Sequence, residues 1–349
     1  MPELQRIAFT AFPPEERPVL TEQLNEWRNS QPFEGAKLLV ATPVFMNTLV
    51  THAVLESAGA ELTIGVSAEL PRDPQALEVI RKAGIDIVEP TSVPPRNYDV
   101  VVDCAAQFRN TSARYGYVEL TRSGASHYVS ARQPVVLVDA SPIKRIETSL
   151  GTGDGFVRGL AHYGHTDLTG KVIAVFGGGK VGQGIAISCH RRGAEVLIID
   201  DPNAVTLPPN VALVDRDDST EVSHQIERAW CIVTATGEPA ALDPWAQTLT
   251  ASNALLANMG VADEFGARVP AERLLNRKAP LNFVLHEPTR LRYLDPVLAL
   301  VNASALHVLR GEAKPGMNPP PADIEAEILS LLSDTRLGQE LVSTPDLTT

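Results

Sequence analysis

The sequence predicts an α/β fold in which two domains are each built on a parallel sheet. The chain has 349 residues, which is too long for one ordinary core and, at roughly 150 residues per domain, indicates two domains. Short apolar runs rich in β-branched residues alternate with helical patterns, as they do in parallel sheets. One such run, in the second half of the chain, leads directly into a glycine-rich turn.

The first domain is predicted to extend from residue 1 to about residue 150. Gly59 and Gly84 follow helical patterns and are stop signals for the helices. Strands are expected at 37–41, 61–66, 85–88, 99–103 and 135–139, and helices at 20–27, 47–57 and 74–83. The intervening stretch before residue 135 is polar and predicts no strand. This domain has no glycine fingerprint, so a nucleotide site is expected in the other domain.

The second domain is predicted around Lys171–Asp201. Val172–Phe176 is an apolar run that is short enough for a buried parallel strand. Gly177, Gly179 and Gly182 follow it with the spacing G-x-G-x-x-G, and a helix opens after them. In such a unit the first glycine permits the tight turn, the second lets the backbone approach a pyrophosphate, and the third lets the helix pack closely. The phosphates would lie at the positive end of this helix.

A second strand, at 195–199, ends at Asp200, eighteen residues after Gly182. A carboxylate at this position accepts hydrogen bonds from the adenosine ribose hydroxyls of a dinucleotide. The same charge repels a 2′-phosphate, so we expect NAD rather than NADP as the cofactor. The order of strand, glycines, helix, strand and acid favours a doubly wound Rossmann domain over a glycine-rich turn in some other α/β domain.

The remaining elements are predicted from shorter patterns. A linker with a helix is expected at 149–168, and further strands are expected at 212–214, 231–234, 254–258 and 283–285. An apolar helix at 296–311 indicates either core or a dimer face, and we expect a homodimer. A segment rich in Pro and Gly precedes an amphipathic helix at 322–332.

The composition excludes several classes of partner. The net charge of −12 argues against nucleic acid or an anionic membrane as a binding partner. No apolar run approaches eighteen residues and no secretory signal is recognised, so we expect a cytoplasmic protein that binds a small-molecule substrate. Cys104, Cys189 and Cys231 lack the spacing of metal ligands and are interpreted as buried thiols, and we expect no metal site.

Beyond the glycine turn, the chain carries an ordered set of short motifs. These are Glu34-Gly35-Ala36-Lys37, Ser57-Ala58-Gly59-Ala60-Glu61, Ser141-Pro142-Ile143-Lys144, Val233-Thr234-Ala235-Thr236-Gly237, Asn258-Met259-Gly260 and Leu300-Val301-Asn302. In register from about residue 20 to residue 313, the set resembles the adenosylhomocysteinase family, within the wider group of two-domain NAD enzymes shaped like formate dehydrogenase. The glycine turn alone is shared by many proteins, whereas the ordered set is far more specific.

The resemblance implies a domain division and a chemistry. A substrate domain of residues 1–150 would be rejoined by the C-terminal segment 303–349, and residues 151–302 would form the NAD-binding Rossmann domain. In that family, tightly held NAD oxidises a ribose hydroxyl, which permits elimination before the hydride is returned. The cofactor-binding residues expected from the glycine turn and the resemblance are Gly177, Gly179, Lys180, Val181, Gly182, Asp200, Thr234, Thr236, Gly237, Asn258, Gly260 and Asn302.

Three residues are catalytic candidates through the same resemblance. Lys144 matches the lysine that faces the oxidised hydroxyl, and a lysine in a desolvated cleft can exchange a proton with a hydroxyl. Its alternative is a solvated lysine at the start of a helix. Asp103 matches the first acid of an Asp-Asp-Gly-Gly turn and would act as a base, orient Lys144, or start a turn by bonding its own backbone. Glu147 would occupy the position of a family aspartate only if the backbone shifted locally.

The substrate side departs from the family. Thr121 matches a threonine of the substrate-binding Glu-Thr-Thr-Thr-Gly segment, whereas Leu120 stands at the catalytic glutamate position. Cys104 stands where the family has a second acid, and is either a nucleophile or a buried thiol. Four nearby arginines would either clamp a carboxylate or phosphate of the substrate or lie on the surface: Arg109, Arg114, Arg122 and Arg132. Three further family positions are replaced by Pro43, Phe45 and Asn47, so recognition of adenosine and homocysteine is expected to be largely rewritten.

Together these residues predict an NAD-dependent enzyme that oxidises a secondary hydroxyl of a small, nucleoside-like metabolite, with Lys144 as acid and base. The sequence leaves open whether the hydride is returned, as in a hydrolase or lyase, or released, as in a dehydrogenase. True hydrolysis of S-adenosylhomocysteine with substitute side chains is one alternative. A catalytically silent NAD-binding regulatory protein is another, and a degenerate fingerprint that binds no nucleotide is a third.

Overall fold

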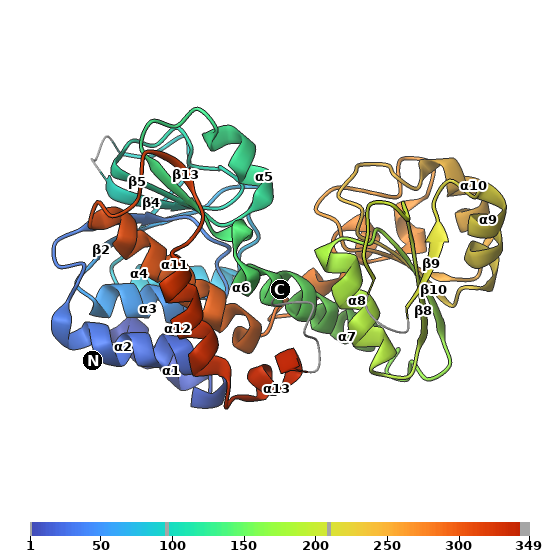
Figure 1. Cartoon of the computed structure of the whole chain (residues 1–349), viewed down its shortest axis with the longest axis horizontal. Helices are drawn as coiled ribbons and strands as arrows, with labels where there is room; N and C mark the ends of the chain where they lie inside the picture. Colours follow the sequence, from blue (N-terminus) through green and yellow to red (C-terminus); the bar gives the residue numbers. More distant parts are fainter. Residues whose placement is uncertain (1, 95–97, 208–210, 343–349) are drawn as a thin grey trace. The chain divides into compact units, whose positions relative to one another are not determined.

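The structure is a computed structural model that describes residues 2–94, 98–207 and 211–342. The chain divides into two compact units (Figure 1). One unit comprises Met1–Lys144 and Arg290–Thr349, and the other comprises Arg145–Thr289. Both are α/β units with parallel sheets, so the predicted fold class is confirmed.

Within the described residues, the first unit contains a seven-stranded sheet in the order β13-β6-β5-β4-β1-β2-β3. Its strands are β1 (Lys37–Val40), β2 (Glu61–Gly65), β3 (Asp86–Val88), β4 (Tyr98–Asp103), β5 (Ala113–Glu119), β6 (Pro134–Leu137) and β13 (Gly316–Asn318). The order reverses between β1 and β4. Ligands of open α/β sheets bind beyond the carboxyl ends of the strands at such a switch point.

The helices of the first unit pack on this sheet or on one another, and most of them are the blue and red helices of Figure 1. They are α1 (Glu3–Ala11), α2 (Pro18–Ser30), α3 (Leu49–Ser57), α4 (Pro74–Lys82), α5 (Arg122–Ala125), α6 (Pro142–Arg145), α11 (Leu291–Leu309), α12 (Ala322–Leu332) and α13 (Arg336–Val342). Most of α11 is buried, because it packs on β4, β5 and α2. The second border between the units therefore precedes α11, whereas the sequence placed it after residue 302.

Strand β5 lies in a stretch that the sequence analysis left without a strand, and that expectation was wrong. Gly116 interrupts the strand with a φ of +149°, and the register with β4 shifts near this point. A Cβ at Gly116 would clash with the carbonyl oxygen of Pro134 on β6. Arg114 is exposed while the last four residues of the strand are buried, so the pattern alternates too weakly to be recognised.

Helix α11 begins at Leu291, five residues before the predicted start at Pro296. Proline favours the first helical turn, which is why the sequence placed the helix start there. In the structure Pro296 lies inside the helix. The preceding residue, Asp295, is fully buried and its two carboxylate oxygens each accept a 2.9 Å hydrogen bond, from the backbone N–H groups of Val19 and Leu20 at the start of α2. This contact ties α11 to α2.

The second unit contains, among its described residues, a six-stranded sheet in the order β12-β11-β10-β7-β8-β9. The strands are β7 (Val172–Phe176), β8 (Glu195–Asp200), β9 (Ala212–Asp215), β10 (Cys231–Thr234), β11 (Leu255–Asn258) and β12 (Leu274–Leu275), and the helices are α7 (Thr152–His162), α8 (Lys180–His190), α9 (Ser219–Arg228) and α10 (Ala246–Ala251). All described pairs are parallel. This is the strand order of the doubly wound Rossmann fold, as predicted.

One predicted strand of this unit is absent. Residues 283–285 were expected to form a strand, but Leu281–Val284 is a 3₁₀ helix that follows Pro280. Phe283 is 43% exposed, so the apolar run does not correspond to a buried strand. The sixth strand is instead the two-residue β12, which is too short to give a sequence pattern.

The segment that enters the second unit packs closely on α8. It comprises the π-helical η4 (Ile146–Gly151) and α7. A Cβ at Gly184 would overlap the carbonyl oxygen of Ser149, and a Cβ at Gly153 would overlap the carbonyl oxygen of Gly184. Backbone therefore meets backbone at this contact, and no larger side chain fits between the two helices.

Candidate functional site

Two of the three fingerprint glycines are required by packing. Gly177 has a φ of +102°, and its N–H donates a 3.0 Å hydrogen bond to the carbonyl oxygen of Ile199 at the end of β8. A Cβ at Gly177 would clash with the carbonyl oxygen of Ala235, and a Cβ at Gly182 would overlap the carbonyl oxygen of Gly177. These positions fix the tight turn and the close approach of α8, as the fingerprint predicts.

Gly179 differs from them because its surroundings are open. It is the N-cap of α8, with φ −71° and ψ −172°, and a Cβ built there meets no atom of the described chain within 4 Å. Lys180 and Val181 form the first turn of the helix that follows. A helix N-terminus beside open space binds phosphate, since the first N–H groups of the helix and its dipole favour an anion.

Asp200 lies at the end of β8 beside the glycine turn. Its Oδ2 accepts a 2.6 Å hydrogen bond from the N–H of Gly178, and its Oδ1 accepts a 2.7 Å bond from the N–H of Asp201. Nη1 of Arg216 lies 3.8 Å from Oδ1, and the Asp200 side chain is 19% exposed. A carboxylate accepts about four hydrogen bonds, so Asp200 keeps the capacity to bind ribose hydroxyls.

The ends of β10 and β11 are joined by buried polar side chains. Thr234 and Asn258 are fully buried, and the Thr234 hydroxyl donates a 2.9 Å hydrogen bond to Oδ1 of Asn258. Nδ2 of Asn258 donates to the carbonyl oxygens of Gly260, Ala262 and Lys278, at 2.6–3.1 Å. Both side chains are thus engaged inside the unit and shape the backbone at this edge of the sheet.

The loop after β10 is held by a residue that the sequence analysis missed. The carboxylate of Glu264 accepts hydrogen bonds from the N–H groups of Thr236 and Gly237 and from the Thr236 hydroxyl. Glu264 has no exposed surface. Its only sequence signal is an acidic residue in the loop that follows Asn258-Met259-Gly260, which does not by itself distinguish it from an exposed loop acid.

In the first unit, Asp103 ends β4 and anchors the loop that follows. It has no exposed surface; its Oδ1 accepts from the N–H of Cys104 at 2.8 Å, and its Oδ2 accepts from the N–H of Phe108 at 2.9 Å and from the Tyr128 hydroxyl at 2.7 Å. Burial raises the pKa of Asp103, and these hydrogen bonds oppose the rise. The contacts favour the turn-forming interpretation of Asp103 over a direct role as base.

Glu119, at the end of β5, holds the same loop and was also missed. It has no exposed surface, and its carboxylate accepts hydrogen bonds from the N–H groups of Ala105, Ala106 and Thr121 and from the Thr121 hydroxyl. Burial raises the pKa of Glu119 to about 7. Ala105 and Ala106 have φ values of +56° and +53°, a conformation that costs free energy for alanine and persists where the surroundings impose it.

The predicted substrate-binding residues differ in their contacts with this loop and in their exposure to solvent. Thr121 is the N-cap of α5, and its Oγ1 accepts from the N–H groups of Ala105 and Gly124. Cys104 and Leu120 are buried, with exposed fractions of 6% and 7%. The four arginine candidates are exposed, and Nη1 of Arg114 lies 3.9 Å from Asp99: Arg109, Arg114, Arg122 and Arg132.

Lys144 and Glu147 lie where the chain passes from the first unit to the second. Lys144 is in α6 and only 6% exposed, which does not fit the alternative of a solvated lysine. Glu147 is half-buried in η4. Asn302 lies in α11 inside the first unit, where its amide oxygen accepts from the Thr51 hydroxyl at 2.7 Å and its amide nitrogen donates to Gln23 at 2.8 Å.

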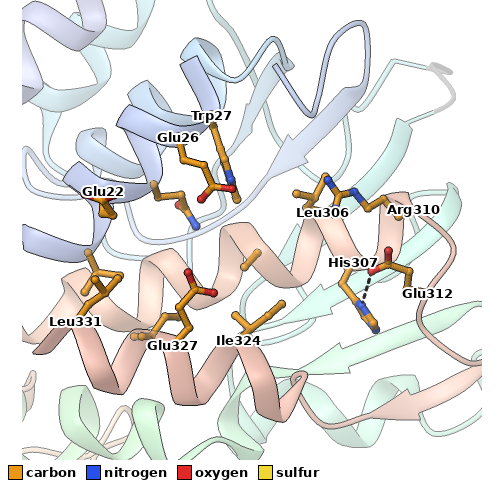
Figure 2. A pocket seen from close by; sticks show the side chains of 14 residues that line it. Glu22, Glu26, Trp27, Leu306, His307, Arg310, Glu312, Ile324, Glu327 and Leu331 are labelled. Carbon is orange, nitrogen blue, oxygen red and sulfur yellow. Dashed lines mark hydrogen bonds and ion pairs between the residues drawn. The ribbon is translucent and has the colours of Figure 1, made fainter. Parts of the chain in front are cut away.

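A cavity of about 190 Å³ lies in the first unit between α2, α11 and α12 (Figure 2). Glu22, Glu26 and Glu327 line it together with apolar side chains such as Leu306 and Leu331. None of the sequence-predicted site residues is among its described lining residues. This cavity is therefore separate from the candidate site.

Two further searches cover the described residues only. They contain no group of three or more His, Cys, Asp or Glu side chains arranged to hold a metal ion. No helix in the same part of the chain is both long enough and apolar enough to cross a bilayer. The described cysteines are buried free thiols, as predicted.

The strand order, the glycine turn and Asp200 define the second unit as an NAD-binding Rossmann domain. Residues 165–271 match the family model described as "Putative NAD(P)-binding". The chain is similar to adenosylhomocysteinases, with 24% identity over 277 residues to that of Thermococcus kodakarensis and 22% over 322 residues to that of Thermoplasma acidophilum. The chain is thus similar to the adenosylhomocysteinases at low identity, and the predicted resemblance and cofactor are confirmed.

The extent of these similarities differs. The alignments cover 70% of this chain and 64% of the Thermococcus protein, and 84% of this chain and 77% of the Thermoplasma protein. The chain therefore spans just under two thirds of the Thermococcus relative. The A chain of dipicolinate synthase from Bacillus subtilis is similar in fold, with a TM-score of 0.50, 13% identity, and coverage of 80% of this chain and 98% of that chain.

Proposed function

We propose that this protein is an enzyme that oxidises a secondary hydroxyl of a small, nucleoside-like metabolite, with NAD as the hydride acceptor. The observation that carries the proposal is the open space at Gly179 beside the N-terminus of α8, together with a partly exposed Asp200 carboxylate at the glycine turn. These groups fit the pyrophosphate and the adenosine ribose of NAD. The match of residues 165–271 to the family model described as "Putative NAD(P)-binding" supports the same assignment.

In this proposal Lys144 exchanges the proton of the substrate hydroxyl. Its amine belongs to a side chain that is only 6% exposed, and restricted access to water favours proton exchange with a bound hydroxyl over exchange with solvent. Asp103 and Glu119 act indirectly, because their carboxylates shape the loop that bears Cys104. Bound NAD supplies the hydride acceptor, and holding substrate and cofactor together supplies a large part of the rate.

The proposal is tested by incubating purified protein with secondary alcohols, nucleosides first, and following NADH absorbance. Lys144→Met should abolish turnover and retain NAD, whereas Lys82→Met, at an exposed position on α4, should change neither. Turnover by Lys144→Met at the wild-type rate would rule out the proton-exchange role. NADH that accumulates in solution indicates a dehydrogenase, and NADH that appears only transiently on the enzyme indicates that the hydride is returned.

Two alternatives have their own tests. Hydrolysis of S-adenosylhomocysteine, the reaction named by the relatives, is tested directly by release of the homocysteine thiol. A catalytically silent NAD-binding protein is favoured by the buried Cys104 and Leu120, which are apolar groups at the ends of β4 and β5. It predicts bound NAD without turnover of any alcohol. Native mass spectrometry would report the retained nucleotide and would test the proposed homodimer in the same measurement.

A further inference from the structure

A single buried carboxylate connects the two loops that follow β10 and β11. Oε2 of Glu264 accepts the N–H of Thr236 at 2.8 Å and its hydroxyl at 2.9 Å, and Oε1 accepts the N–H of Gly237 at 2.8 Å. The backbone continues the connection, because Leu242 donates its N–H to the carbonyl oxygen of Glu264 at 2.9 Å. Three donors of the loop after β10 thus converge on the two oxygens of one side chain.

The carboxylate has little room to move. A Cβ at Gly260 would overlap Oε1 of Glu264, so the backbone of the loop after β11 closes one side of the group. The side chain has no exposed surface. Losing the carboxylate would remove the shared acceptor of the half-buried Thr236 and of the Gly237 N–H, and with it the three hydrogen bonds that hold this loop. Glu264 therefore fixes the position of Thr236 and Gly237 relative to β11.

The fixed loop lies against the glycine turn. A Cβ on Gly177 would lie 2.8 Å from the backbone nitrogen of Thr236 and would clash with the carbonyl oxygen of Ala235. This contact joins the ends of β7 and β10, the point at which the strand order of the sheet reverses. A dinucleotide crosses a doubly wound sheet at this point, with one half on each side. Asp200 marks the β8 side as the adenosine half, so the loops after β10 and β11 border the nicotinamide half.

We propose that Glu264 is a positioning residue for the nicotinamide half of NAD. Its carboxylate sets the backbone of Thr236 and Gly237, which borders that half, and leaves the adenosine half to the glycine turn and Asp200. The inference rests on the NAD assignment and adds to it a residue outside the glycine fingerprint. It predicts that the two halves of the cofactor respond differently to substitution of Glu264.

The test compares NAD with ADP-ribose, which lacks the nicotinamide ring, by calorimetric titration of the full-length protein. Glu264→Gln keeps the size of the side chain but places an amide N–H where an N–H of the loop needs an acceptor. We expect its Kd for NAD to rise about tenfold, the loss of about one charge-assisted hydrogen bond, with ADP-ribose affinity changed less than twofold. Glu264→Leu, which loses all three hydrogen bonds, should weaken NAD binding further. Glu238→Gln, at an exposed position of the same loop, should change neither affinity.

Equal weakening of NAD and ADP-ribose in Glu264→Gln would overturn the proposal, because it would indicate a general loss of structure. Unchanged NAD affinity in both variants would overturn it as well. If thermal unfolding shows that Glu264→Leu does not fold, the Glu264→Gln titration alone decides. Wild-type protein that binds neither ligand would contradict the cofactor assignment itself, before any variant is compared.

Discussion

Asp200 and Gly178 are joined by a 2.6 Å hydrogen bond from the glycine N–H to the carboxylate. The bond connects the end of β8 to the centre of the turn between β7 and α8, so the acid that we propose to bind the ribose also helps to hold the backbone of the glycine turn. Arg216 lies 3.8 Å from the same carboxylate. In the proposed NAD site, selectivity between NAD and NADP would therefore depend on the Asp200 carboxylate and on the guanidinium beside it.

Asp200→Asn is expected to lower the affinity for NAD about tenfold, or about 1.4 kcal/mol, and to reduce the preference for NAD over NADP. The amide loses the charge that repels a 2′-phosphate, while the guanidinium of Arg216 remains to attract one. Titration with both dinucleotides measures the change. Asp201→Asn alters the charge of the adjacent residue and serves as the control. A selectivity that is equally reduced in the control would show that net charge, and not Asp200, discriminates.

Gly179→Ala and Gly182→Ala are expected to separate function from folding. The Gly179 backbone is in an extended conformation with open space around it, so alanine should leave thermal stability within about 1 kcal/mol while its methyl group obstructs the pyrophosphate. In Gly182→Ala the methyl group would overlap the carbonyl oxygen of Gly177. This variant should lower the free energy of unfolding by about 1–3 kcal/mol. Denaturant unfolding and NAD titration of both variants check the pair. If the Gly179→Ala protein binds NAD with wild-type affinity, the phosphates do not bind at Gly179.

The buried Glu119 is expected to make stability fall as the pH rises. Burial raises its pKa from 4.5 to about 7, so the folded state binds more protons than the unfolded state between these values. The stabilising contribution is complete below pH 4.5 and is lost as the pH rises through 7, by about 3 kcal/mol in all. Glu119→Gln should show a shallower decline of the free energy of unfolding between pH 5 and pH 7.5 in urea titrations. An identical pH slope in the variant would refute this assignment.

His52 is expected to have the opposite effect in acid. It is fully buried, neither ring nitrogen has a hydrogen-bond partner among the described residues, and burial lowers its pKa from 6.5 to about 4. The unfolded state then takes up the proton first, so stability falls as the pH drops from 6.5 towards 4, by about 3 kcal/mol. His52→Leu should be more stable than wild type and lose less stability in this window. His190→Leu, at an exposed position, should follow the wild-type curve.

The sequence predicted the parts of the site that depend on neighbouring residues. The glycine turn and Asp200 lie within one βαβ unit, so spacing alone located them. Glu119 and Glu264 bind backbone N–H groups up to 28 residues away, and no local pattern marks such partners. At the end of β5 the family register drew attention to Leu120, whereas the anchoring carboxylate is one residue earlier. Side chains of neighbouring residues in an extended chain point to opposite faces. A difference of one position therefore separates Glu119, which binds the loop, from Leu120, which does not.

The glycine contact between α7 and α8 has a mechanical consequence. Backbone meets backbone at this crossing, without intervening side chains, so we expect the two helices to move together. One of these helices, α7, belongs to the segment by which the chain enters the second unit, and the other, α8, begins at its N-cap Gly179. A displacement of the segment that enters the second unit would therefore also shift the N-terminus of α8, where we propose that the pyrophosphate of the dinucleotide binds.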